Sequence, residues 1–140
     1  MKKLFILTIL NLMSIMANAS VVNYQFKCSN HSEDIFAKVL IENYTTQQGM
    51  ITEFHQKGDL MLYSTDGKLI YQSSLELSSD HMGLRCGYQQ SLEGYDSNGN
   101  EFIHYTDYFT QNCDTLTGGT PVRSSTILKL LDYPDCKAFK

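Results

Sequence analysis

Apolar and polar residues alternate in short segments along most of the chain, which is the pattern of half-buried β-strands. In the first such segment, Val22, Tyr24, Phe26 and Cys28 alternate with polar neighbours. Turn residues separate the segments at close intervals. Further strands are expected at residues 49–55, 60–64, 68–77, 81–90, 91–95, 101–109 and 126–131. The pattern predicts an all-β fold, a small antiparallel β-sandwich or barrel built as a meander of hairpins.

Two segments depart from this simple pattern. Residues 32–44 fit a helix through Ile35, Phe36, Val39 and Leu40, after a possible cap at Ser32. They fit a strand equally well, because Ile35, Ala37, Val39 and Ile41 alternate along one face. The β-branched residues and the strand-rich surroundings favour the strand. Residues 112–125, with two adjacent glycines and a proline, are expected to form a loop.

The segment YDSNGNE, residues 95–101, carries the strongest turn signal. Asn98-Gly99 between alternating segments predicts a two-residue type I′ turn, whose central residues both need positive φ. That turn would place Tyr95 opposite Phe102 and Glu93 opposite His104. Leu92, Ile103 and Tyr105 would then form a core stripe, while Tyr95, Phe102 and the Glu93–His104 pair would face solvent.

The same segment also has features of a calcium loop. Asp96, Asn98 and Asn100 occupy the first, third and fifth positions of a D-x-[DN]-x-[DN] pattern. An EF-hand loop needs glycine at its sixth position and glutamate at its twelfth, where this chain has Glu101 and Asp107. We therefore favour the hairpin and expect no metal site. In the predicted register Asp96 lies directly opposite Glu101, which leaves that pair as the place where a cation could bind.

A second segment, YSTDGKLIY at residues 63–71, resembles YDSNGNEFIHY at residues 95–105. Turn chemistry explains this similarity more readily than a duplicated binding hairpin, because Asp-Gly and Asn-Gly turns resemble one another. By analogy with Tyr95 and Phe102, we expect Tyr63 and Ile70 to share an exposed face.

The N-terminus predicts export from the cytoplasm. Two lysines precede an uncharged apolar run that ends in an A-x-A cleavage pattern at Ala17–Ala19, as in a secretory signal peptide. We expect a signal peptide at residues 1–19 and a single β-rich domain at 20–140, located in a bacterial periplasm or secreted. No membrane insertion is expected after cleavage.

Charge narrows the class of partner. Without Lys2 and Lys3, nine basic residues remain against fifteen acidic ones, a net charge near −6. An acidic surface repels nucleic-acid phosphates and favours encounters with cationic partners. The oligomeric state stays open.

Four cysteines in an exported chain of this size predict two disulfides. Their spacing lacks the close pairs of a zinc site. Three connectivities are possible; we favour Cys28–Cys136, which would tie the ends of the domain together, and Cys86–Cys113, which would bracket the second hairpin.

No catalytic motif is present. The four histidines show no metal spacing, and no nucleophile elbow surrounds any serine. We expect neither enzymatic activity nor a cofactor. A small secreted hydrolase that uses His81 with Asp80 remains an alternative.

Nine tyrosines and no tryptophan distinguish the composition, and six of these tyrosines fall in the two hairpins and their neighbours. Tyrosine suits the wall of a small barrel and also an interface. In general plan the chain resembles small periplasmic β-barrel inhibitors of lysozyme, and STDGKLIY, residues 64–71, resembles their short inhibitory segment. The residues around that segment depart from the family's motif.

Together these features predict an exported, disulfide-stabilised, non-enzymatic domain that binds another macromolecule, such as a cationic protein of the lysozyme type. A carbohydrate or cell-envelope binding module is the alternative. The expected binding residues are Tyr63, Ile70, Glu93, Tyr95, Phe102 and His104.

Overall fold

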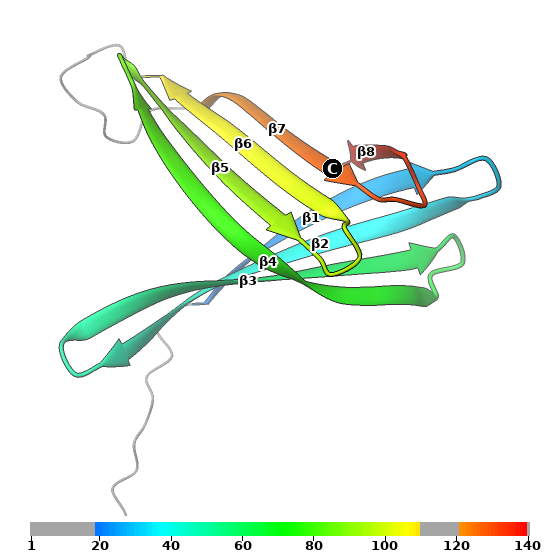
Figure 1. Ribbon diagram of the computed structural model, residues 1–140, viewed down its shortest axis with the longest axis horizontal. Helices are drawn as coiled ribbons and strands as arrows, with labels where there is room; N and C mark the ends of the chain where they lie inside the picture. The colour runs from blue at the N-terminus through cyan, green and yellow to red at the C-terminus, as the bar shows by residue number, and fades with distance from the viewer. Residues whose placement is uncertain (1–18, 110–120, 140) are drawn as a thin grey trace, which may run out of the picture.

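The computed structural model describes residues 19–109 and 121–139, and every regular element within them is a β-strand. The eight strands are β1 (Ser20–Ser29), β2 (Asp34–Gln48), β3 (Ile51–Ser64), β4 (Leu69–Leu84), β5 (Gly87–Tyr95), β6 (Glu101–Phe109), β7 (Pro121–Lys129) and β8 (Asp135–Phe139). All pairings are antiparallel, in the order β7-β6-β5-β4-β3-β2-β1-β8. Because β7 and β8 at the two ends lie beside each other, the sheet curls into a nearly closed barrel (Figure 1). The predicted all-β antiparallel fold is confirmed, and of the two predicted architectures, sandwich or barrel, the structure shows the barrel.

The sheet divides at β4, which changes its partner halfway along its length. The first half of β4 pairs with β3 as far as Gly58 opposite Leu75, and the second half pairs with β5 from Glu76 opposite Tyr95 onward. Beyond this point the β2–β3 hairpin and the β4–β5 hairpin diverge (Figure 1). We call them the β2–β3 arm, residues 43–57, and the β4–β5 arm, residues 78–91.

These long strands correct several predicted boundaries. The segments 49–55 and 60–64 are one continuous strand, β3, and the segment 81–90 spans the tight turn between β4 and β5. Residues 121–125 belong to β7 instead of a loop, and β8 was not predicted. Segment 32–44 forms a strand from Asp34 onward, as we favoured, because its alternate residues fill the barrel.

The core lies inside the barrel, where alternate residues of the strands meet. Its fully buried members are Phe26, Cys28, Ile35, Val39, Ile41, Leu60 and Phe102. Gly58 and Gly94 let the side chain of Leu77 pack against their backbones at the point where the arms diverge. A Cβ atom on Gly94 would lie 2.8 Å from the side chain of Leu77, and one on Gly58 would lie 3.0 Å from it. A side chain at either position would therefore displace Leu77 from the core.

The β5–β6 turn is not the predicted two-residue turn. The Asp96 amide donates to the Asn100 carbonyl at 3.1 Å, and the Gly99 amide donates to the Asp96 carbonyl at 3.1 Å. Gly99 alone in this turn has positive φ, at 83°. This is a three-residue loop, a type I turn followed by a left-handed glycine. The Asp96 carboxylate selects it, since one of its oxygens accepts from the amides of Asn98 and Asn100, both at 2.9 Å.

The different turn shifts the predicted register by one residue. Tyr95 lies opposite Glu101, Gly94 opposite Phe102, and Glu93 opposite Ile103. A one-residue shift exchanges the two faces of a strand. Phe102 is therefore in the core, while Ile103 and Tyr105 lie on the outer side of the sheet. Leu92 and Ile103 are both buried, as predicted. The predictions of an exposed Phe102, of one core stripe shared by Leu92, Ile103 and Tyr105, and of an Asp96–Glu101 pair were wrong.

The repeated segment forms the same turn. The Ser64 amide donates to the Lys68 carbonyl and the Gly67 amide donates to the Ser64 carbonyl, both at 2.9 Å, and Gly67 has φ 87°. The similarity between the two segments thus reflects shared turn chemistry at matching positions, as the sequence favoured.

The predicted disulfide Cys28–Cys136 is confirmed and joins β1 to β8 at directly paired positions. The sequence predicted two disulfides, and Cys28–Cys136 is the one found among the residues that the structure describes. Cys86 is not a free thiol, and Cys113, its predicted partner, lies outside the described residues.

A disulfide is compatible with an exported protein. The predicted signal peptide falls, apart from Ala19, outside the described residues. Within the described ranges we find no helix with the length and apolar character needed to cross a membrane.

Candidate functional site

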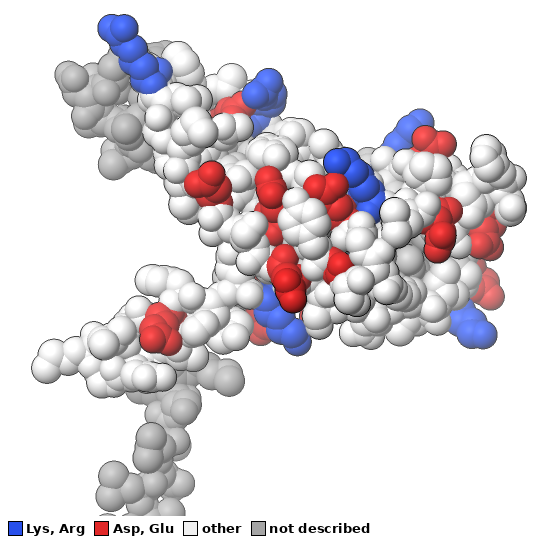
Figure 2. All heavy atoms as spheres, in the orientation of Figure 1, with Lys and Arg blue, Asp and Glu red and all other residues white. Residues whose placement is uncertain are grey.

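The outward side of β4 to β7 carries a concentration of carboxylates, which we call the acidic face. Alternation along each strand, together with the register, brings these side chains to one side of the sheet. Figure 2 shows acidic side chains gathered over this part of the molecule. The acidic face comprises the carboxylates of Glu76, Asp80, Glu93, Glu101 and Asp107 and the cations of Arg123 and Lys129.

Both cations lie on β7 and are already paired. Lys129 contacts Glu101 at 2.9 Å, and Arg123 contacts Asp107 at 2.6 Å. The hydrogen-bonded ion pair between Lys129 and Glu101 lowers the pKa of Glu101 and raises the pKa of Lys129. By contrast, Glu76, Asp80 and Glu93 on β4 and β5 form no salt bridge with any described residue. The negative charge is therefore least compensated on the β4–β5 side of the face.

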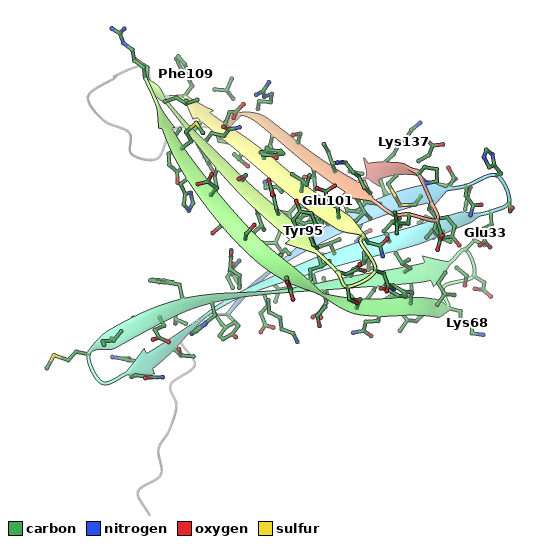
Figure 3. The ribbon with its side chains drawn as sticks, in the orientation of Figure 1. Glu33, Lys68, Tyr95, Glu101, Phe109 and Lys137 are labelled. Carbon is green, nitrogen blue, oxygen red and sulfur yellow. A yellow bond between two sulfur atoms is a disulfide. The ribbon has the colours of Figure 1, made fainter. Side chains whose placement is uncertain are left out.

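Two tyrosines converge on Glu93. The hydroxyl of Tyr105 donates to Oε1 at 3.0 Å and the hydroxyl of Tyr95 donates to Oε2 at 3.2 Å, so that both carboxylate oxygens accept. Tyr95 and Glu101 lie side by side at the ends of β5 and β6 (Figure 3). Hydrogen bonding to Glu101, followed by burial and Glu93, raises the pKa of Tyr95 to about 12. Both hydroxyls consequently stay protonated at neutral pH, and their rings are held in fixed positions.

Apolar side chains fill the space between the charges. Ile103 is buried, and its neighbour Ile127 on β7 is 43% exposed, as is Tyr95. Apolar and tyrosine side chains surrounded by charged groups match the composition of protein interfaces, in which an apolar centre is bordered by a polar rim. The rigid sheet beneath them would keep the ordering cost of binding low.

The expected binding residues separate into two groups on β5 and β6. Glu93 and Tyr95 lie together on the acidic face, in direct hydrogen-bond contact. Phe102 and His104 lie on the opposite, inner side, because the register differs from the predicted one. His104 is hydrogen-bonded to Thr126 and Thr106, each at 2.8 Å, and burial lowers its pKa. The predicted Glu93–His104 pair does not exist.

Tyr63 and Ile70 do not form an equivalent site. Tyr63 is half-buried, with the Lys38 ammonium 5.3 Å from the centre of its ring. The pairing passes from Leu62–Tyr71 to Tyr63–Leu69, which leaves Ile70 unpaired in a bulge. Ile70 is 48% exposed there. Neither residue belongs to the acidic face.

Sequence reasoning missed Glu76, Tyr105 and Glu101 as members of one surface. The available signal was the turn itself, because Asp96 and Gly99 occupy the first and fourth positions that a type I turn favours. Reading the turn that way would have fixed the observed register of β5 and β6 and grouped Glu101 and Tyr105 with Tyr95. Glu76 joins them through the pairing of β4 with β5.

The structure does not assemble the proposed His81–Asp80 dyad. The Asp80 carboxylate accepts from the backbone amide of His81 at 2.8 Å, while the imidazole of His81 stacks on Tyr88 and is hydrogen-bonded to its hydroxyl. Adjacent strand residues point to opposite faces, which explains the separation. No three metal-ligating side chains cluster within residues 19–109 and 121–139.

The chain matches no protein-family model, and neither a curated protein nor a solved structure is significantly similar to it.

Proposed function

We propose that the mature chain is an exported, non-enzymatic binding domain whose acidic face docks a cationic protein. The observation that carries this proposal is the group of three carboxylates, Glu76, Asp80 and Glu93, without a cationic partner among the described residues. A basic partner would supply the missing charges. Like-charged surfaces would be repelled, so the arrangement gives selectivity as well as attraction.

The tyrosines add to this role. Tyr95 and Tyr105 present rings whose hydroxyls are already satisfied by Glu93. Docking would bury the rings without leaving a polar atom unpaired. The resemblance in general plan to periplasmic inhibitors of lysozyme makes a lysozyme the first partner to test.

The proposal predicts salt-sensitive binding to a basic protein. We expect the oxidised chain 20–140 to bind purified lysozyme, or basic proteins captured from envelope and host extracts. The affinity should fall at least about tenfold between 50 and 300 mM NaCl, because salt screens exposed charges. Titration calorimetry at the two salt concentrations measures this. An acidic protein of similar size serves as the control and should not bind.

The proposal would be contradicted if neither purified lysozyme nor any basic protein from the extracts binds. An affinity that salt leaves unchanged would contradict it equally.

A further inference from the structure

The two arms enclose a cleft that the proposed protein-binding role does not use. Figure 2 shows the hollow where the arms diverge. The cleft has a volume of about 420 Å³, which lies within the range of small-molecule sites. Its lining residues are Ser20, Asn43, Tyr44, Thr45, Phe54, His55, Gln56, Ser79, His81 and Gln90.

The lining has an unusual charge composition for this protein. It contains no Asp, Glu, Lys or Arg, although the acidic face lies on the other side of the β4–β5 arm. Its polar groups are amides, hydroxyls and imidazoles, which both donate and accept hydrogen bonds. Such a lining suits a ligand rich in uncharged hydroxyl or amide groups.

The amide side chains are partly preorganised. The Gln56 amide nitrogen donates to the Asn43 side-chain oxygen at 2.8 Å, which fixes the orientation of both groups. This contact leaves the Gln56 oxygen and the Asn43 nitrogen available to a ligand. Across the cleft, Gln90 makes no side-chain hydrogen bond with the described part of the chain. An apolar ligand would bury these amides without partners, at a cost in free energy.

Aromatic rings from both arms face the cleft. On the β4–β5 arm the rings of His81 and Tyr88 lie 5.6 Å apart at an angle of 19°. Phe54 is 85% exposed at the cleft. The electron-rich face of an aromatic ring attracts the weakly positive C–H groups of a sugar ring.

From these observations we propose that the cleft between the arms binds an uncharged oligosaccharide, held by the amides of Asn43, Gln56 and Gln90 and by ring contacts from Phe54 and His81. This site is separate from the acidic face. The two proposals therefore stand or fall independently.

The test is an amide-resolved NMR titration of the oxidised chain 20–140 with neutral tetrasaccharides. Tetramers of N-acetylglucosamine, glucose in β-1,4 linkage and glucose in α-1,4 linkage are the probes, and a tetramer of galacturonate is the charged comparison. We expect at least one neutral probe to shift cleft amides with a millimolar or lower Kd that is unchanged between 50 and 300 mM NaCl. Gln56→Ala and His81→Ala should each weaken this binding about tenfold.

Glu42→Gln provides the control, because Glu42 lies on β2 directly beside the arm but points away from the cleft lining. Glu42→Gln should leave the Kd of the neutral probe unchanged, and its NMR spectrum should match that of the folded, unsubstituted chain. The proposal is overturned if no neutral probe shifts the cleft amides at 10 mM. It is equally overturned if galacturonate binds more tightly than every neutral probe, or if the shifts persist in both cleft variants.

Discussion

Replacing Phe102 with alanine is expected to lower the free energy of unfolding by about 4 kcal/mol. Phe102 is fully buried, and its ring centre lies 5.0 Å from that of Tyr24 inside the barrel. Deleting the ring removes apolar surface from the core and leaves a cavity that the surrounding strands can fill only in part. Denaturant unfolding of the oxidised chain, followed by circular dichroism, measures the change.

Tyr95→Ala is the matched control, since Tyr95 belongs to the same hairpin but is 43% exposed. We expect it to cost less than about 1 kcal/mol. The register with a two-residue Asn98-Gly99 turn makes the opposite prediction, because it exposes both aromatic residues. Equal, small effects of the two substitutions would therefore contradict the observed register.

Asp96→Ala is expected to destabilise the protein by about 3 kcal/mol at pH 7. The carboxylate is buried and accepts from the amides of Asn98 and Asn100. It also accepts from the Asn100 side chain at 2.8 Å and from the Tyr71 hydroxyl at 2.9 Å. Removing it leaves several donors unsatisfied, and it releases the turn from β4. The same unfolding measurement applies.

The effect of Asp96 should depend on pH. Burial by itself raises the pKa of Asp96, but the hydrogen bonds from Asn100, Tyr71 and Asn98 together outweigh it and hold the pKa below its usual value. A depressed pKa stabilises the folded state above the pKa of the unfolded chain, about 3.9, and this contribution is lost as pH falls through the folded value. The difference in stability between the native chain and Asp96→Asn should therefore be constant near neutral pH and shrink below about pH 4.

Ser64→Ala tests whether the turn geometry alone, without the buried carboxylate, accounts for the stability that is lost in Asp96→Ala. Ser64 occupies the position of Asp96 in the equivalent turn, with the same backbone hydrogen bonds but no buried carboxylate. We expect a cost below about 1 kcal/mol. A similar loss for both variants, or a pH-independent difference for Asp96→Asn, would show that the carboxylate does not anchor the turn.

The barrel and the disulfide between its terminal strands could be predicted because their signals are local or strongly constrained. Alternation through Val22–Cys28 indicated a strand, and among three possible pairings of the cysteines we favoured the one that joins the two nearest the ends of the domain. The register of β5 and β6 was missed for an equally local reason. Asn98-Gly99 suggested a two-residue turn, whereas the Asp96 side chain stabilises a three-residue one, and a shift of one residue moved Phe102 from the surface to the core.

The arms and the cleft could not be predicted from pattern alone. Gly58 and Asp59 suggest a break between two short strands. The glycine instead continues β3 because the absence of a Cβ lets Leu77 pack against its backbone. That contact links positions 19 residues apart, and it lies at the point where β4 changes partner. The acidic face depends both on this change of partner by β4 and on the observed register of β5 and β6.

The most direct test of the account is a pair of charge reversals at equal net charge. Glu76→Lys with Asp80→Lys changes the uncompensated part of the acidic face, and Glu42→Lys with Glu53→Lys makes the same change in net charge on the β2–β3 hairpin. All four side chains are exposed. Titration calorimetry against the basic partner at 50 mM NaCl should give at least a tenfold weaker Kd for the acidic-face variant and less than a threefold change for the β2–β3 hairpin variant. Equal losses in both variants, or no loss in the first, would contradict the proposal that the acidic face binds the partner.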